Sequence, residues 1–375
     1  MPCEEMVIQD AGDLHQRLDL PRGIPPLTSL YLYIAGACNL ACRHCWIAPA
    51  FDPNGNGGQF VKLEHVEKAV REGKQLGLQS VKLTGGEPLL HPRFRELVAL
   101  LAGAGLDITI ETNGTLLDDK LAGYLKGTGR VSFISVSVDG ATAQVHEALR
   151  VVPGSFDAAL DGIQALVRAG YHPQMICTLH QGNAAQMGDM VALAERLGCG
   201  SIKFNHLQSS GRGEQYAVEQ GLRVAEVLRL YRALEREVLP ESKIPVYYDI
   251  PVAFHSIRQL TRDPLSSCRV LNILGMLAGG ELALCGIGTT VPELIYGHIA
   301  YDDLRAVWSG SPGLTQLRAL LPAQLEGVCG QCLHRDTCLG ACVANNYHET
   351  GRLNAAYRFC AEADGLGVFP ASRRR

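Results

Sequence analysis

The pattern of apolar positions near the start of the chain predicts a buried strand followed by a helix. Residues 27–36 read LTSLYLYIAG, a short run of apolar and aromatic side chains that ends at a glycine. Such a run is typical of a strand inside a sheet. Further along, Leu63, Val66 and Val70 lie on one face of a segment with helical spacing, residues 63–76. A strand followed by a helix is the first unit of the fold.

This alternation continues to about residue 240. Strands that alternate with helices of about ten to fifteen residues indicate right-handed βαβ units and a parallel sheet. Six units are too few for a closed eight-stranded barrel, so a partial, splayed barrel and an open doubly wound sheet both fit. We expect the further strands at 80–84, 107–111, 131–138, 173–179 and 201–206, and the further helices at 93–101, 118–125, 156–169, 185–197 and 222–238.

The regular pattern ends after Leu239 and Pro240. The apolar segments become shorter there, and seven of the 13 cysteines lie between Cys268 and Cys360. Three regions are therefore expected: an N-terminal extension over residues 1–27, a strand–helix domain over 28–240, and a second region over 241–375. We expect something other than a large apolar core to hold the second region together.

The composition excludes several classes of protein. The 34 basic and 38 acidic residues give a formal net charge of −4, and the arginine-rich stretch at residues 372–375 is short, so no broad nucleic-acid-binding surface is expected. The chain has no long apolar run and no secretion signal, which favours a cytoplasmic protein without membrane contact. Thirteen cysteines in such a protein indicate metal or redox chemistry rather than disulfides.

Three cysteines follow the first predicted strand directly, in the sequence CNLACRHCW. Cys38, Cys42 and Cys45 have the spacing C-x3-C-x2-C. Three thiolates on a short loop can hold three corners of a [4Fe–4S] cluster and leave one iron open for a substrate or cofactor. The alternatives are a zinc site completed by His44, which is awkwardly placed next to Cys45, and cysteines that are simply packed.

The second predicted strand ends in TGGEP, which contains Gly85, Gly86 and Glu87. Two glycines permit the close approach of a ligand to the backbone, and the carboxylate can accept hydrogen bonds from an ammonium group. Because both motifs follow parallel strands, we expect them on the same rim of the sheet, where ligands of such folds bind. Taken alone, TGGEP could equally be a turn that carries a charge.

The two motifs together resemble those of the radical S-adenosylmethionine (radical SAM) superfamily. The resemblance covers about residues 28–240 and implies an α/β fold with a partial (β/α)6 barrel, in agreement with the six units. It implies that Cys38, Cys42 and Cys45 ligate a [4Fe–4S] cluster whose open iron binds SAM. Reductive cleavage of SAM would yield a 5′-deoxyadenosyl radical that takes a hydrogen atom from the substrate, with flavodoxin or ferredoxin as the electron donor.

Other SAM contacts follow from the resemblance at matching positions. The GGE segment resembles one that contacts the methionine ammonium group, and residues 211–213 resemble a loop near the adenine. The strand ends ETNG and SVSVDG and a later arginine match further contact positions. For these rim positions the alternative is ordinary loop polarity or helix capping. The implied SAM contacts are Trp46, Gly85, Gly86, Glu87, Thr112, Asn113, Ser137, Asp139 and Arg150.

The second region resembles the SPASM extension of radical SAM enzymes. Its cysteines have the spacing C-x11-G-x4-C, then C-x2-C-x5-C-x3-C, then a single cysteine. A zinc ribbon on the four middle cysteines would leave the other three without a role. The resemblance implies two auxiliary clusters and therefore three [4Fe–4S] clusters in all. The implied ligands are Cys268, Cys285 and Cys342 for the first auxiliary cluster, and Cys329, Cys332, Cys338 and Cys360 for the second.

The first auxiliary cluster would have only three cysteine ligands. Sulfatase-maturing relatives carry another cysteine shortly after the first, whereas residues 269–284 contain none. We expect an open or exchangeable iron, unless Cys3, Cys177 or Cys199 completes the site. Cys177 lies on the fifth predicted strand and could face the barrel interior.

SPASM-type enzymes mostly modify peptides or proteins. The resemblance therefore implies a maturase of a ribosomally made precursor peptide, acting by a thioether link, a carbon–carbon link, epimerisation or backbone excision. The segment before the first strand is too short for a leader-peptide recognition domain, so a separate protein is expected to supply one. The alternatives are a radical SAM enzyme for a small molecule or enzyme cofactor, and a non-enzymatic electron-transfer protein. A long groove would favour a peptide, and a small sealed cavity a small molecule.

Overall fold

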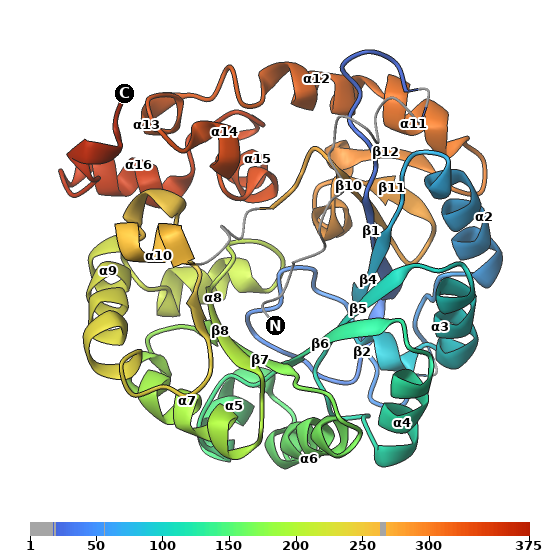
Figure 1. Cartoon of the computed structure of the whole chain (residues 1–375), viewed down its shortest axis with the longest axis horizontal. Helices are drawn as coiled ribbons and strands as arrows, with labels where there is room; N and C mark the ends of the chain where they lie inside the picture. The colour runs from blue at the N-terminus through green and yellow to red at the C-terminus, as the bar shows by residue number, and fades with distance from the viewer. Residues whose placement is uncertain (1–17, 19, 56, 263–267) are drawn as a thin grey trace.

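The computed structural model describes residues 18, 20–55, 57–262 and 268–375. Six parallel strands lie side by side in chain order, and the helices that connect them lie on the outside of the curved sheet (Figure 1). A doubly wound sheet reverses its strand order and has helices on both faces, so the sequential order identifies the partial barrel. The six strands are β1 (Ser29–Ala35), β4 (Ser80–Gly85), β5 (Asp107–Thr112), β6 (Val131–Ser137), β7 (Gln174–Leu179) and β8 (Ser201–His206).

The helices predicted from the sequence are present within a few residues of their expected ends. Two further helices had no clear apolar pattern and were not predicted: α5 (Ala143–Arg150) and α8 (Gly213–Gln220). Both lie at the rim where the strands end, and α5 carries the candidate SAM contact Arg150. The predicted helices are α2 (Leu63–Lys74), α3 (Phe94–Gly103), α4 (Asp119–Gly127), α6 (Ser155–Arg168), α7 (Met187–Arg196) and α9 (Val224–Ala233).

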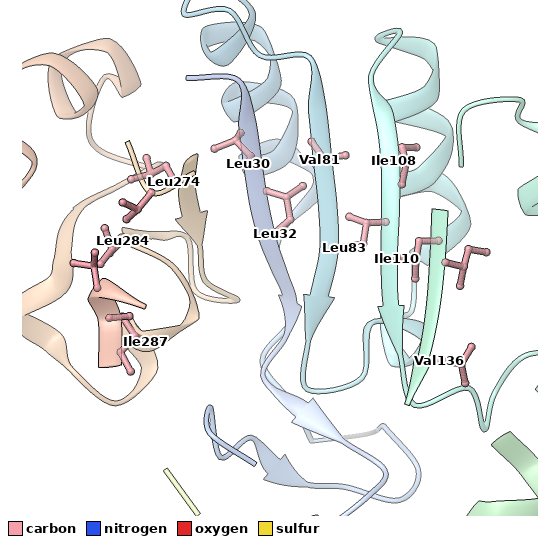
Figure 2. Packing of buried hydrophobic residues seen from close by; sticks show 14 of the residues in the cluster. Leu30, Leu32, Val81, Leu83, Ile108, Ile110, Val136, Leu274, Leu284 and Ile287 are labelled. Carbon is pink, nitrogen blue, oxygen red and sulfur yellow. The ribbon is translucent and has the colours of Figure 1, made fainter. Parts of the chain in front are cut away.

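The two faces of each barrel strand differ in chemistry because side chains alternate along a strand. The outer face of β1 carries Leu30 and Leu32, which are fully buried and lie beside Val81 and Leu83 of β4 (Figure 2). The inner face carries polar side chains such as Lys82, whose Nζ lies 2.8 Å from Glu111 Oε1. The apolar core therefore lies between sheet and helices, and the barrel interior is polar.

The second region continues the same sheet at both edges. Strand β9 (Val246–Tyr248) pairs in parallel with β8, and β10 (Ile273–Met276) pairs in parallel with β1. Strands β11 (Glu281–Ala283) and β12 (Ile295–His298) follow β10 as antiparallel neighbours. The order of the sheet is β12-β11-β10-β1-β4-β5-β6-β7-β8-β9.

The expectation of a second region without a large apolar core is wrong. Most of its buried apolar side chains belong to the same hydrophobic core as the barrel, and they include Leu274, Leu284 and Trp308. Leu274 and Leu284 lie on the far side of β1 from Val81 (Figure 2). The sequence did not indicate this packing because the apolar residues sit on or beside strands of three or four residues and on a helix of seven, too short for a visible period. The expected division at residues 27 and 240 remains a prediction.

Short helices complete the second region and follow the barrel's outline from α11 round to α10 (Figure 1). Within the described parts of the chain, no helix has both the length and the apolar character needed to cross a membrane. Apart from residue 18 and residues 20–27, the expected N-terminal extension lies outside the described residues. The helices are α10 (Ile257–Arg262), α11 (Leu304–Gly310), α12 (Pro312–Leu320), α13 (Gly327–Gly330), α14 (Arg335–Cys338), α15 (Val343–Thr350) and α16 (Arg358–Gly365).

Candidate functional site

The three cysteines of the first motif lie together at the end of β1. Cys38 ends the short strand β2 (Ala37–Cys38), which pairs with β3 (Ala50–Phe51) and closes the loop at its base. Burial raises the pKa of Cys38 to about 12, and the Glu87 carboxylate, Cys42 and Cys45 add to this rise. Cys38, Cys42 and Leu40 form one small packed cluster, and Cys45 packs against it, so the loop brings the three cysteines together.

The surroundings of these thiols fit thiolates that bind an iron–sulfur cluster. Three groups with N–H donors face the sulfurs: the Leu40 backbone N at 3.4 Å from Cys38 Sγ, Asn113 Nδ2 at 3.8 Å from the same atom, and Arg150 Nη1 at 3.8 Å from Cys42 Sγ. Donors to sulfur stabilise thiolate ligands and tune a cluster's potential. This donor set therefore suits a [4Fe–4S] cluster.

A single zinc ion fits these residues less well. His44, the expected fourth ligand of a zinc site, has its Nε2 3.9 Å from Asp139 Oδ2. Among the residues that the structure describes, no group of three or more His, Cys, Asp or Glu side chains is arranged to hold one metal ion. Thiolates that bind different irons of a cluster stand farther apart than ligands of one ion, so this finding is consistent with a cluster.

The two glycines of TGGEP bring the second motif against the cysteine loop. A Cβ on Gly86 would lie 1.9 Å from the Ala37 carbonyl oxygen, and one on Gly85 would lie 2.7 Å from the Ala35 carbonyl oxygen. The Glu87 backbone N donates to the Ala37 carbonyl oxygen at 2.9 Å. In this structure, therefore, the close approach that the glycines permit is to the neighbouring backbone.

Glu87 is fully buried and is held by three donors. Its carboxylate accepts hydrogen bonds from Thr112 Oγ1 at 2.7 Å, from the Asn113 backbone N at 2.8 Å and from the Leu89 backbone N at 3.1 Å. Burial raises the pKa of Glu87 to about 6, although the three hydrogen bonds act to lower it. The structure thus brings Glu87, Thr112 and Asn113 together beside Cys38.

A buried ion pair lies on the other side of the cysteine loop. Arg150 Nε and Nη2 each lie 2.7 Å from Asp139 Oδ2, and the Thr178 backbone N donates to Asp139 Oδ1 at 2.7 Å. Burial alone would raise the pKa of Asp139, but Arg150 and the neighbouring histidines hold it at about 2. Two expected SAM contacts are therefore already paired with each other, with Arg150 facing Cys42.

Two histidines next to this ion pair, His44 and His146, are further functional candidates. The sequence suggests His44 only as a zinc ligand and does not single out His146. Burial lowers the pKa of His44 and of His146 to about 4, so both rings are neutral at pH 7. His146 Nδ1 accepts a hydrogen bond from the Asp139 backbone N at 3.1 Å. No sequence signal marked His146, because the helix that carries it was not predicted.

The remaining expected contacts are placed around the same loop. Trp46 packs edge-on against Tyr33, with ring centroids 6.4 Å apart, and Ser137 is the last residue of β6. Residues 211–213 lie against the cysteine loop: Arg212 Nε donates to the Cys42 carbonyl oxygen at 2.9 Å, and a Cβ on Gly211 would lie 2.5 Å from the Trp46 carbonyl oxygen. All expected SAM contacts therefore lie on the rim at the carboxyl ends of the strands.

The barrel interior holds a second charged group that the sequence reasoning also missed. Lys82 pairs with Glu111 and lies over the Tyr31 ring, 4.5 Å from its centroid. Lys203 of β8 acts with Lys82 to lower the pKa of Glu111, against the effect of burial. The strands were predicted, but the inward direction of these side chains depends on the register of the sheet.

Four cysteines of the second region line one hollow, and two others lie within electrostatic reach of Cys285. Cys329, Cys332, Cys338 and Cys360 line one hollow together with Phe369. A hydrogen bond with Cys360 lowers the pKa of Cys329 to about 7. Burial raises the pKa of Cys285, and the nearby Cys342 and Cys268 raise it further.

The three other cysteines do not join these groups where the structure describes them. Cys177 pairs in register with the fully buried Phe204 and lies in the core between sheet and helices, so the idea that it faces the barrel interior is wrong. Cys199 is buried in the same core. Cys3 lies outside the described residues.

Comparison with known proteins identifies relatives of this arrangement. Residues 32–194 match the family model of the radical SAM superfamily. An AdoMet-dependent heme synthase of Methanosarcina barkeri is 28% identical over 351 residues, which cover 88% of this chain and 95% of that protein. Mycofactocin maturase MftC of Mycobacterium ulcerans is 29% identical over 358 residues, which cover 90% of this chain and 88% of that protein.

Two solved structures share the fold. Streptococcus suis SuiB bound to precursor peptide SuiA has a TM-score of 0.72 at 17% identity, covering 93% of this chain and 78% of that one. Native anSMEcpe with bound AdoMet has a TM-score of 0.69 at 16% identity, covering 92% of this chain and 96% of that one. At these identities the likeness concerns the fold alone.

The ion pair beside the cysteine loop predicts a large loss of stability in Asp139→Asn. The substitution leaves the buried Arg150 charge without its carboxylate, which should cost about 3–5 kcal/mol in the free energy of unfolding. Folding lowers the pKa of Asp139 from 3.8 to about 2, so the pair's stabilisation is complete above about pH 4 and is lost as the pH falls toward 2. Denaturant unfolding of both proteins at pH 7 and pH 3 measures the difference.

Asp119→Asn is the matched control. Asp119 Oδ1 lies 2.8 Å from Arg168 Nε in a pair that is exposed on the outer helices. Exposed pairs contribute little, so the control should unfold like the unmodified protein. Equal losses in the two variants would contradict a buried, stabilising pair.

Proposed function

We propose that this chain, a radical SAM enzyme, is a maturase that modifies a ribosomally made precursor peptide. The observation that carries the proposal is the meeting of three elements at one barrel rim: the three-cysteine loop, the buried Glu87 and the Asp139–Arg150 pair. Relatives named for peptide maturation span nearly the whole chain. The proposed modification is a thioether or carbon–carbon link, an epimerisation or a backbone excision.

Each part of the rim has a role in this proposal. Cys38, Cys42 and Cys45 hold a [4Fe–4S] cluster, which with SAM supplies the 5′-deoxyadenosyl radical. The buried Glu87 presents a carboxylate, already ordered by Thr112 and Asn113, to the ammonium group of SAM. Residues around the loop exclude water, which protects a reactive radical from side reactions.

A groove between the barrel and the second region supports a peptide as the substrate. It has a volume of about 770 Å³, including the part open to solvent, and runs from the ends of β7 and β8 to helices α15 and α16. His206 lines it on the barrel side, and Asp249, Glu349 and Arg358 line it from the second region. A hydrogen bond of 2.6 Å from Ser209 Oγ to Glu349 Oε1 joins the two sides. A hollow of this size that is open to solvent and lined by charged side chains can admit a peptide segment.

The groove also borders the proposed first auxiliary cluster. Burial raises the pKa of Cys342, and the carboxylates of Asp249 and Glu349, which line the groove, raise it further. In this proposal Cys268, Cys285 and Cys342 leave one iron open to a ligand that enters by the groove. The second auxiliary cluster uses Cys329, Cys332, Cys338 and Cys360. In the same proposal, a separate protein presents the leader peptide.

A small-molecule substrate is the second candidate, and one observation favours it. A relative that covers 88% of this chain is named as an AdoMet-dependent heme synthase. The charged side chains of the barrel interior, Lys82, Glu111 and Lys203, could equally bind a small polar substrate. The two candidates share the radical chemistry and differ only in the substrate.

Incubation with SAM and dithionite tests the function directly. We expect the reconstituted protein to form 5′-deoxyadenosine and to change the mass of a short peptide encoded beside its own gene. An iron porphyrin precursor with propionate side chains is the comparison substrate. Modification of the porphyrin but not of the peptide would reject the maturase and support the second candidate.

The first cysteine loop predicts the loss of all SAM cleavage in the triple variant Cys38→Ala, Cys42→Ala, Cys45→Ala. Without three thiolates the catalytic cluster has no protein ligands, so 5′-deoxyadenosine should be absent. Cys199→Ala removes a core cysteine outside the groups and is the matched control, with activity expected to persist. Product formation by the triple variant would show that another site cleaves SAM.

The grouping of the ten cysteines predicts about twelve irons per chain after anaerobic reconstitution, as three four-iron clusters. The triple variant of the first loop should keep about eight irons, and so should Cys329→Ala, Cys332→Ala, Cys360→Ala. Iron and sulfide analysis with EPR spectroscopy measures this. A count near four in the unmodified protein would reject both auxiliary clusters and leave the catalytic one.

A further inference from the structure

The last three residues in the sequence, Arg373 to Arg375, lie along the segment that carries Cys332. The Leu333 backbone N donates to the Arg373 carbonyl oxygen at 2.9 Å, and the Arg375 backbone N donates to the Gln331 carbonyl oxygen at 2.8 Å. Cys332 and Arg374 form an antiparallel bridge between these bonds. The backbone therefore holds three consecutive arginines beside one of the four cysteines of the second hollow.

These arginines form a positive patch on an otherwise acidic chain. Arg375 and Arg335 share a single carboxylate, Asp336, at 2.7 and 3.4 Å, and Arg374 pairs with Asp364. Arg373 Nη2 donates to the His255 carbonyl oxygen, and within the described parts of the chain no carboxylate pairs with it. Four guanidinium groups thus face two carboxylates, whereas the whole chain has a formal net charge of −4.

The patch adjoins the second cysteine hollow. The backbone bridge holds Arg374 opposite Cys332, with Arg373 and Arg375 on either side of it. Cys332, His334 and Arg335 line the hollow, and between the first two the side chain of Leu333 is 49% exposed. An exposed apolar side chain beside several arginines is a common composition for a protein contact.

We propose that this patch is the docking surface for a small acidic one-electron carrier protein, of the flavodoxin or ferredoxin class. The carrier's carboxylates would meet the arginines, and Leu333 would contact its apolar rim. One electron would pass from the reduced flavin or iron–sulfur group of the carrier, which is oxidised, to the [4Fe–4S] cluster that Cys329, Cys332, Cys338 and Cys360 would hold, which is reduced from its 2+ to its 1+ state. The inference rests on the proposed function in one respect: the reductive cleavage of SAM needs an electron.

Charge complementarity is the reason for choosing this partner. Complementary charge mainly raises the rate at which two proteins associate, and the effect falls with ionic strength. An electron carrier gains from such steering because it must bind quickly and leave again. The position of the patch, one residue from a cluster ligand, keeps the path for the electron short.

The test compares two double variants of equal charge change in the reconstituted enzyme. Arg373→Gln with Arg375→Gln removes two charges from the patch. Arg130→Gln with Arg168→Gln removes two charges from exposed pairs on the outside of the barrel. Stopped-flow spectroscopy follows the oxidation of a purified acidic flavodoxin hydroquinone by each enzyme at low and at high salt.

We expect the patch variant to accept electrons about tenfold more slowly at low salt, with the difference lost at high salt, and the control to behave like the unmodified enzyme. Equal rates in the patch variant and the unmodified enzyme would overturn the proposal, as would equal slowing in the control. Patch-dependent binding to RNA or to anionic vesicles, with flavodoxin transfer unaffected, would overturn it in favour of that partner.

Two further measurements distinguish a failure of this proposal from a failure of the proposed function and from a loss of iron in the variant. SAM cleavage driven by dithionite should be unchanged in the patch variant, because dithionite is a small reductant that needs no docking site. If no protein, including the unmodified enzyme, cleaved SAM with dithionite, the proposed function would be rejected instead. If the double variant loses iron, the single variant Arg375→Gln, at an exposed side chain, repeats the comparison. A flavodoxin rate unchanged in that iron-replete variant would overturn the role of the patch.

Discussion

The contact between the TGGEP turn and the cysteine loop is the constraint on which the catalytic rim depends. Gly86 lies so close to the Ala37 carbonyl oxygen that any Cβ would overlap it, at 1.9 Å. The backbone bond from Glu87 N to the same oxygen sets the distance between the two motifs. A larger residue at either glycine would separate Glu87 from Cys38, two groups that the proposed function needs close together.

Polar contacts order the same rim, but burial disfavours the charged, thiolate form of two of its cysteines. Burial raises the pKa of both Cys38 and Cys42, which favours the protonated thiols at neutral pH. In the proposed cluster site, iron would displace these protons, and its positive charge would compensate for the buried negative charge. Asn113 and Arg150 face the sulfurs of Cys38 and Cys42, where they would donate to thiolates that hold a cluster.

The sequence predicted the parts of the fold that are encoded locally. The six barrel strands and six of the helices were found because each carries its own apolar period over six or more residues. Strands such as β10 and β11 have only four and three residues, and they are stabilised by neighbours far away in the chain. The cysteine groups came from spacing and resemblance. The ion pair of Lys82 with Glu111 and the support of Asp139 by His146 depend on sheet register and on an unpredicted helix, neither of which the sequence displays.

The sheet also determines how the catalytic loop and the second region are placed relative to one another. Strand β1 leads into the cysteine loop at its carboxyl end, and along its length it pairs with β10. A Cβ on Gly275 of β10 would lie 2.8 Å from Cys285 Cα, so that cysteine rests directly on the strand next to β1. Tyr33 of β1 packs against Trp46 on one side. Burial raises the pKa of the Tyr33 phenol, and the nearby Cys285 raises it further. The two cysteine sites are therefore joined by hydrogen-bonded strands and packed rings rather than by a flexible linker, which favours a fixed distance between them.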